Sequence, residues 1–298
     1  MQRFPEHVSK PPFSPVPAAF QSTAERSGAR SANPTILTDP VDLRRQMDEP
    51  QLLLIDCREP EAYKKGHLRT AVNLPPSSME WSVRLPDGNE IHHLLAPAER
   101  IAPLLWFVGI HRESRIVIYD DGAGYTAARI FWILDYFAHP NPAILNGGLP
   151  AWKSAGGNLS TDEPLYPRGD FIPDPDPARI ADFQALNSLQ GDDGVLLLNS
   201  LPRKNFQKEA IPGSINIPYT EVYRSRRSVC LLDPQEIEAL FGKAAIFPTH
   251  ELIPYCGIGY TASLLYFTAR LLGYPRVRLY DGSLADWKAR GGALAPGR

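Results

Sequence analysis

The sequence has few cysteines, no long hydrophobic run and no marked excess of either charge. Its three cysteines, Cys57, Cys230 and Cys256, cannot all pair with one another, and none lies in a CxxC motif. This favours a reducing compartment, which we take to be the cytoplasm, and disfavours a structural zinc site. The longest apolar stretches, such as "RIVIY" and "LLLIDC", are far shorter than the ~20 residues of a membrane-spanning helix. The formal net charge of −2 leaves no basic excess that would indicate nucleic acid or an anionic membrane as a partner.

The length and composition are those of a globular protein of about two domains. Of the 298 residues, 43% are hydrophobic and 21% are charged. Residues 1–34 are rich in Pro, Ser and Ala and lack the unbroken apolar core of a secretory signal. A transit peptide is the alternative, but the prolines would interrupt its amphipathic helix. We therefore expect a flexible N-terminal tail.

An internal comparison shows that the chain repeats itself. The stretch "LLLIDCREPEAYKKGHLRTAVNLP" (52–75) matches "VLLLNSLPRKNFQKEAIPGSINIP" (195–218) at a shift of 143 positions. Further on, the glycines and the helix of "IYDDGAGYTAARIFWIL" (118–134) match those of "PYCGIGYTASLLYFTAR" (254–270) at a shift of 135. "NGGLPAW" and "DGSLADW" match at the same shift of 135. Ordered matches of this kind indicate a tandem duplication.

Each half alternates short apolar runs with helical segments. The runs predicted to be strands buried on both faces are 52–55, 115–119 and 143–145 in the first half, and 195–198, 251–255 and 276–280 in the second. This alternation predicts an α/β fold: in each half, a mainly parallel sheet flanked by helices. We place the domains at 35–160 and 179–298. The Pro- and Asp-rich segment 161–178 is predicted to be an extended linker.

The two halves differ at the turn between strand and helix. Asp121 stands opposite Cys256, whereas the neighbouring Gly, Gly, Tyr and Thr residues are the same in both halves. Glycines allow the backbone to converge several N–H groups on one point, and the helix that follows adds partial positive charge at its N-terminus. Both effects favour the charged thiolate at Cys256. Since active sites of open α/β sheets lie at the carboxyl ends of the strands, we predict that Cys256 is a catalytic nucleophile. Cys57 and Cys230 are expected to be structural.

These motifs resemble the rhodanese family of thiosulfate and 3-mercaptopyruvate sulfurtransferases. The resemblance covers both repeats and rests on "DCREPEAYKKGH", "IPGSINIP", "CGIGYT" and "YDGSLADW". It implies two tandem rhodanese-like domains, of which the first is non-catalytic and the second catalytic. It also implies a ping-pong reaction: Cys256 takes the outer sulfur of a small donor as a persulfide and passes it to a thiophilic acceptor such as cyanide, a small thiol or a thioredoxin-like protein. The persulfide itself carries the transferred group, so we expect neither a metal nor an organic cofactor.

The loop "CGIGYT" is predicted to be the sulfur-binding cradle. Its members after Cys256 are Gly257, Ile258, Gly259, Tyr260 and Thr261. In the phosphatases and arsenate reductases that resemble this family, the corresponding loop is one residue longer and ends in Arg, whose guanidinium fork holds a tetrahedral oxyanion. No Arg occurs from 257 through 263, so phosphatase activity is not expected.

The donor stays open between thiosulfate and 3-mercaptopyruvate. In the mercaptopyruvate enzymes that the chain resembles, an Asp-x-Arg element of the second repeat binds the substrate carboxylate. Here that element is Asn199-Ser200-Leu201, and the Gly-His pair that follows it is replaced by Glu209-Ala210. Candidate substitutes as anion binders are basic residues, each of which could equally form a solvated face: Arg203, Lys204, Arg224, Arg226 and Arg227.

Two further motifs and one alternative function remain. His92 and His93 lie in a polar insertion without acidic or cysteine partners at ligand spacing, so a metal site is not expected. Arg129 is expected to pair with Asp120 or Asp121 in a structural site. A function of another class is a non-enzymatic persulfide carrier or sensor, in which Cys256 accepts sulfur from a protein partner.

Overall fold

The structure is a computed structural model that describes residues 33–225 and 229–298. The expected N-terminal tail therefore falls outside the described residues except for its last two positions. Arg226 and Arg227, two of the candidate anion binders, fall outside them as well.

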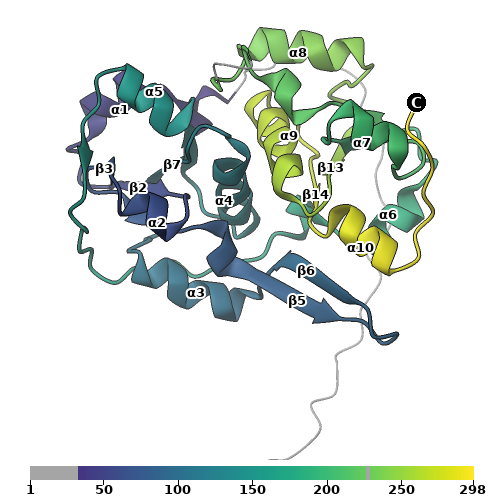
Figure 1. Cartoon of the computed structure of the whole chain (residues 1–298), viewed down its shortest axis with the longest axis horizontal. Helices are drawn as coiled ribbons and strands as arrows, with labels where there is room; N and C mark the ends of the chain where they lie inside the picture. Colours follow the sequence, from purple (N-terminus) through teal and green to yellow (C-terminus); the bar gives the residue numbers. More distant parts are fainter. Residues whose placement is uncertain (1–32, 226–228) are drawn as a thin grey trace, which may run out of the picture. The chain divides into compact units, whose positions relative to one another are not determined.

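The first half alternates strands and helices as the sequence pattern predicts (Figure 1). Its elements are η1 Pro34–Ile36, β1 Leu37–Thr38, α1 Pro40–Gln46, β2 Leu52–Asp56, α2 Pro60–Tyr63, β3 His67–Leu68, β4 Val72–Asn73, η2 Pro76–Met79, β5 Glu80–Arg84, β6 Glu90–Leu95, α3 Ala98–Phe107, β7 Arg115–Tyr119, α4 Tyr125–Tyr136, β8 Pro142–Leu145, α5 Gly148–Ser154 and β9 Leu159–Ser160.

The second half repeats this order in a shorter form. Its elements are η3 Pro177–Arg179, β10 Ile180–Ala181, α6 Phe183–Leu189, β11 Val195–Asn199, α7 Arg203–Lys208, β12 Ile215–Asn216, η4 Tyr219–Val222, α8 Pro234–Lys243, β13 Glu251–Tyr255, α9 Tyr260–Leu271, β14 Leu279–Tyr280 and α10 Ser283–Ala289.

The two sheets have the same topology, which confirms the predicted fold class. In the first half the strand order is β1-β8-β7-β2-β4, and every pair is parallel. In the second half β12, β11 and β13 are parallel neighbours, and β10 pairs with β14. A single parallel bridge between Leu252 and Val277 joins β13 to the start of the β14 run. The expected strand 276–280 is therefore regular only at Leu279–Tyr280.

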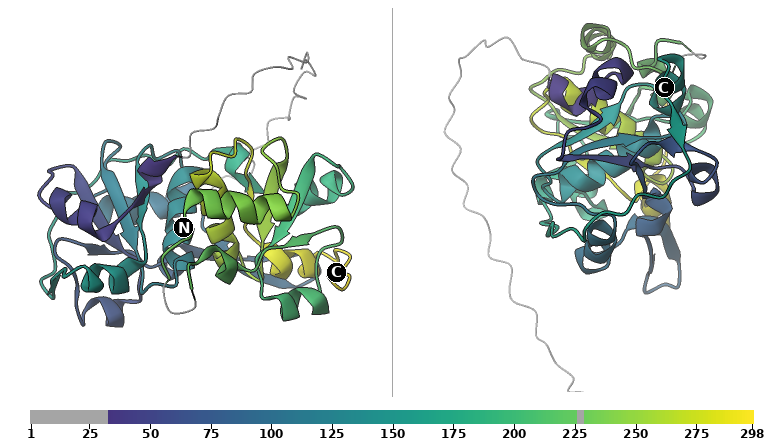
Figure 2. Two further views of the ribbon diagram at one scale, coloured as in Figure 1. Left: turned by 90° about the horizontal axis from the view of Figure 1, so that it is seen from above. Right: turned by 90° about the vertical axis from the view of Figure 1, so that its left-hand side faces the viewer.

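The two halves pack on each other through helices α4 and α9, which lie side by side in Figure 1 and in the left view of Figure 2. Both helices are apolar nearly all round, with most of their residues buried. The rings of Phe131 and Phe267 meet edge to face, with 4.9 Å between their centroids. A helix that is buried on every side reads as a continuous apolar segment, as both of these do in the sequence.

The β5–β6 hairpin is longer than its counterpart in the second half, of which the described residues show only the antiparallel bridge between Tyr223 and Leu231. It is antiparallel and reaches the second half, where Asn89 Nδ2 donates to the carbonyl of Ala289 at 3.4 Å. Its base is held at the turn between β13 and α9, since the Tyr260 hydroxyl donates to Glu80 at 2.6 Å. The hairpin thus brings first-half side chains to the loop that contains Cys256.

The segment between the halves, 161–176, contains no helix or strand, although part of it is packed. Phe171 is 2% exposed, and its carbonyl accepts a hydrogen bond from Trp106 Nε1 at 2.7 Å. In the described ranges, no helix is both long and apolar enough to cross a membrane.

Candidate active site

Cys256 lies directly after β13, at the carboxyl end of a central strand of the second sheet. The chain then turns through Gly257, Ile258 and Gly259 into helix α9. Gly259 has a φ of 91°, a left-handed conformation that non-glycine residues rarely adopt. In this conformation its backbone N–H points at the Cys256 sulfur, and the N–Sγ distance is 3.1 Å. An N–H donor aimed at sulfur stabilises negative charge there.

Ser283 supports the same loop from the start of α10. Its hydroxyl lies 3.0 Å from the backbone N of Cys256, donates to the Tyr280 carbonyl at 2.9 Å and lies 4.0 Å from Cys256 Sγ. Ser283 is fully buried with a φ of 49°, and Gly148 occupies the equivalent place in the first half with a φ of 55°. We did not expect this role for Ser283. The Gly-to-Ser difference between "NGGLPAW" and "DGSLADW" is the sequence signal that could have revealed it.

The residue that replaces the thiol in the first half is Asp120, so our assignment of Asp121 was wrong. The carbonyls of Asp120 and Cys256 accept from Leu149 and Leu284 at 2.9 and 3.0 Å, which makes the two residues equivalent. The first loop, "DDGAGYT", is one residue longer than "CGIGYT", so the strands match at a shift of 136 and the helices at 135. Comparison from the helix side therefore reached the wrong aspartate.

The Asp120 carboxylate shows what such a loop does. It accepts backbone hydrogen bonds from Gly122 at 2.8 Å and from Ala127 at 3.2 Å. Burial raises the pKa of Asp120, and these backbone donors oppose that rise. The duplicated loop thus directs N–H donors at the position that the Cys256 sulfur occupies in the second half.

As far as the residues are described, the second loop opens into a larger space than the first. A pocket of about 410 Å³ is lined by residues of both halves: Glu80, His93, Tyr125, Leu201, Cys256, Gly257, Ile258, Tyr260 and Thr261. The space beside the Asp120 loop is about 20 Å³. Cys256 itself is 2% exposed, so its sulfur lies at the bottom of the pocket. Four residues of the predicted cradle line the pocket: Gly257, Ile258, Tyr260 and Thr261. The fifth, Gly259, does not line it but donates its backbone N–H to the Cys256 sulfur.

The hairpin contributes an acid and a base that sequence reasoning missed. Glu80 accepts from the Tyr260 hydroxyl at 2.6 Å, and its other oxygen lies 2.8 Å from His93 Nδ1. Burial, and next the hydrogen bond to Glu80, raise the pKa of Tyr260, so that its phenol stays protonated. The residue matching Glu80 at the shift of 143 is Tyr223, which fits against the first loop and donates to the carbonyl of Ala123. Each half therefore covers the loop of the other.

Arg129 does not pair with Asp120 or Asp121, contrary to expectation. Its Nη2 lies 2.6 Å from Asp281 Oδ1 of the second half, and the two side chains are 2% and 8% exposed. Nη2 also lies 3.4 Å from the His93 carbonyl, while Asp281 Oδ2 accepts from the backbone N of Leu95 at 2.8 Å. The ion pair therefore joins the hairpin to the second half.

The basic residues proposed as anion binders do not line the pocket where the structure describes them. Arg203 and Lys204 are exposed on α7. Arg224 pairs with Asp233 at 2.5 Å and bonds to the Leu231 carbonyl. Its described neighbours Tyr223, Val229 and Leu231 line the space beside the first loop, whereas we expected this segment to approach the Cys256 pocket.

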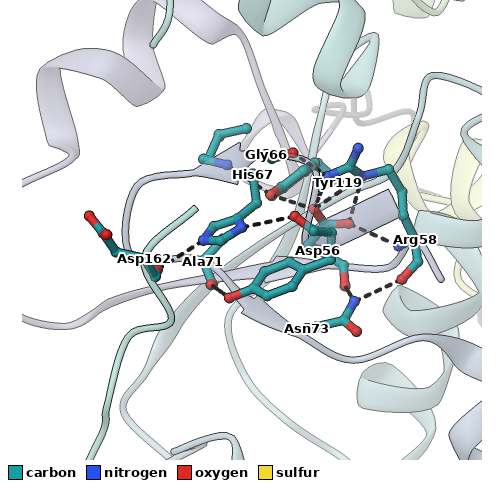
Figure 3. A network of polar contacts seen from close by, with 10 residues as sticks. Asp56, Arg58, Gly66, His67, Ala71, Asn73, Tyr119 and Asp162 are labelled. Carbon is teal, nitrogen blue, oxygen red and sulfur yellow. Dashed lines mark hydrogen bonds and ion pairs between the residues drawn. The ribbon is translucent and has the colours of Figure 1, made fainter. Parts of the chain in front are cut away.

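The Asp-x-Arg motif is complete only in the first half (Figure 3). There Arg58 forms two hydrogen bonds to Asp56 Oδ2, at 2.6 and 3.1 Å, and Tyr119 donates to the same oxygen at 2.8 Å. In the second half Asn199 replaces the aspartate and accepts from the backbone N of Leu201 at 2.9 Å. The side chain at the arginine position, that of Leu201, lines the pocket.

The other cysteines have surroundings unlike those of Cys256. Burial, and next the nearby Asp120 and Asp56, raise the pKa of the Cys57 thiol well above its usual value. Cys230 is half-buried in the segment that covers the first loop. Among the residues that the structure describes, no group of three His, Cys, Asp or Glu side chains is placed to hold a metal ion.

Comparison with known proteins agrees with this architecture. The profile of the rhodanese-like domain family matches residues 39–155 and 182–290. A probable 3-mercaptopyruvate sulfurtransferase of Pseudomonas aeruginosa is 31% identical over 266 residues, covering 82% of this chain and 92% of the relative. A thiosulfate sulfurtransferase of the same organism is 28% identical, covering 85% and 93%. The crystal structure of SseA from Escherichia coli, described as a 3-mercaptopyruvate sulfotransferase with the rhodanese fold, is similar with a TM-score of 0.73. It is 24% identical, and the match covers 83% of this chain and 98% of SseA. The chain therefore belongs to the rhodanese family, with two rhodanese-like domains in tandem.

Proposed function

We propose that the chain is a sulfurtransferase that carries sulfur as a persulfide on Cys256. The donor is thiosulfate or 3-mercaptopyruvate, and the acceptor is a thiophile such as cyanide or a thiol. The observation that carries this proposal is the placement of Cys256 Sγ: it lies 3.1 Å from the N–H of Gly259 and at the bottom of an open pocket. The names of the relatives support the same reaction class.

In the first step the Cys256 thiolate attacks the outer sulfur of the donor. With thiosulfate the S–S bond breaks, and sulfite leaves with the electron pair. With 3-mercaptopyruvate the C–S bond breaks, and the enolate of pyruvate leaves and takes up a proton. His93, 45% exposed and lining the pocket, is placed to supply that proton.

In the second step the acceptor attacks the outer persulfide sulfur. The S–S bond breaks, and its electron pair returns to Cys256 Sγ as thiolate. The Gly259 N–H faces this sulfur in both steps, so it needs no rearrangement while charge moves on and off the sulfur.

A non-enzymatic persulfide carrier is the second candidate. The observation that favours it is the composition of the pocket wall, where Leu201 stands at the position of the Asp-x-Arg arginine. A carrier would receive sulfur from a protein and need no side chain that binds a small anionic donor.

Steady-state kinetics with both donors separate these readings. Wild type should turn over with at least one donor, Cys256→Ser should lose turnover, and Cys230→Ser should retain it as the matched thiol control. Undiminished turnover in Cys256→Ser would refute the assignment. Persulfide formation from a protein donor only, with no turnover of either small donor, would establish the carrier.

A further inference from the structure

The charge of the pocket differs from what an anionic substrate requires. Among its nine described lining residues, Glu80 supplies a carboxyl group and His93 an imidazole, beside the thiol of Cys256. No arginine or lysine of residues 33–225 and 229–298 lines it. The guanidinium of Arg129 lies behind the loop and is already paired with Asp281.

The described wall therefore contains a carboxyl group without an arginine or lysine beside it. The neighbours of the Glu80 carboxyl group are His93 Nδ1 at 2.8 Å and the Tyr260 hydroxyl at 2.6 Å. Burial raises the pKa of both Tyr125 and Tyr260, so that neither phenol adds or removes charge near neutral pH.

The Glu80 carboxyl group is accessible from the pocket. Its side chain is 23% exposed and lines the pocket together with Cys256. A carboxylate in such a place is a suitable partner for an alkylammonium group, since charge-assisted hydrogen bonds are the stronger ones.

We propose that the sulfur acceptor of this site is a small aminothiol, whose ammonium group is held at Glu80 while its sulfur attacks the persulfide. This inference rests on the proposed function, because it assigns the second step of that reaction. The acceptor thiolate attacks the outer sulfur, the S–S bond of the persulfide breaks, and Cys256 regains its electron pair. The product is the aminothiol persulfide. The same charge distribution implies that the anionic donors, thiosulfate and 3-mercaptopyruvate, bind weakly in the pocket.

A matched series of thiols tests the proposal. Cysteamine, 2-mercaptoethanol and 3-mercaptopropionate attach an ammonium, a hydroxyl and a carboxylate group to sulfur through the same two-carbon spacer. The protein, in a Cys230→Ser background, is loaded with excess inorganic polysulfide, and loading is verified by whole-protein mass. Second-order rate constants for loss of the persulfide are then measured with each thiol. For each protein we take the ratio of the rate constant with cysteamine to the rate constant with 3-mercaptopropionate. The intrinsic reactivity of the thiols cancels when this ratio in a variant is divided by the same ratio in wild type.

Glu80→Gln keeps the shape and removes the charge. We expect the ratio of cysteamine to 3-mercaptopropionate to fall about tenfold, the scale of one screened charge contact. Leu201→Arg adds a cation to the wall and should move the ratio further towards 3-mercaptopropionate, with Leu201→Met as the size-matched control. Equal ratios in wild type, Glu80→Gln and Leu201→Arg would overturn the proposal. Failure of the proposed function is distinguishable, because Cys256 would then take up no sulfur from thiosulfate or 3-mercaptopyruvate, whereas loading with polysulfide needs neither of these donors.

Discussion

The guanidinium of Arg129 and the carboxylate of Asp281 form a buried ion pair that joins the two halves of the chain. Nη2 and Oδ1 are 2.6 Å apart. Arg129 belongs to α4, whereas Asp281 follows β14 and also holds the backbone of Leu95 at the end of the hairpin. The pair therefore fixes Glu80 and His93 over the Cys256 loop, although neither of its members lines the pocket.

Removing one member of this pair should destabilise the protein strongly. Arg129→Met leaves the Asp281 carboxylate buried without its partner, which costs about 3–5 kcal/mol in the free energy of unfolding. The double variant Arg129→Met/Asp281→Asn should recover part of this loss, since no buried charge remains. Urea denaturation of wild type, both single variants and the double variant gives the coupling energy. Additive effects in that cycle would contradict the role of the pair.

The Asp56–Arg58 pair of the first half should be structural and not catalytic. Asp56 is fully buried, and neither residue lines the pocket. Arg58→Leu copies the residue of the second half and should lower the free energy of unfolding by about 3 kcal/mol. Adding Asp56→Asn completes the copy and should restore part of the stability. Persulfide formation per folded molecule should stay at the wild-type rate in both variants; a selective loss of that rate would assign the pair to the reaction.

The two glycines of the Cys256 loop should differ in their tolerance of a side chain. A Cβ at Gly259 would lie 2.6 Å from the Asp281 carbonyl oxygen and would require a φ of +91° from alanine. We expect Gly259→Ala to lose at least about 1 kcal/mol of stability and most of the rate of persulfide formation, since the N–H would leave the sulfur. A Cβ at Gly257 would meet no atom within 4 Å, so Gly257→Ala should fold with wild-type stability. Thermal unfolding and single-turnover kinetics check both variants. Equal behaviour of the two variants would show that the Gly259 conformation has no role.

Strands and turns that occur in both halves were predicted from the sequence, whereas contacts made by side chains of one half alone were not. Strands such as Arg115–Tyr119 and Glu251–Tyr255 were predicted to the residue, because buried parallel strands are short unbroken apolar runs. The position of Cys256 at a strand end followed from the same pattern. The misassignment of Asp121 arose from one extra residue in a loop, which the matching glycines and helix concealed.

The parts of the site that come from the other half could not be read locally. Glu80 and His93 belong to a polar hairpin whose sequence does not match that of the second half, so the repeat comparison gave no indication of their place. Arg129 was expected to find an acid nearby in sequence, yet its partner, Asp281, lies 152 positions away in the chain (281 − 129). Such pairings depend on how α4 and α9 pack, and no periodicity encodes that.

The most direct test of the account is to locate the transferred sulfur. After treatment with thiosulfate or 3-mercaptopyruvate and removal of the donor, whole-protein and peptide mass spectrometry are run without reductant. The account predicts a gain of one sulfur atom on the peptide that contains Cys256, and its release when an acceptor thiol is added. A gain on the Cys57 or Cys230 peptide instead, or an unmodified Cys256 after exposure to both donors, would contradict it.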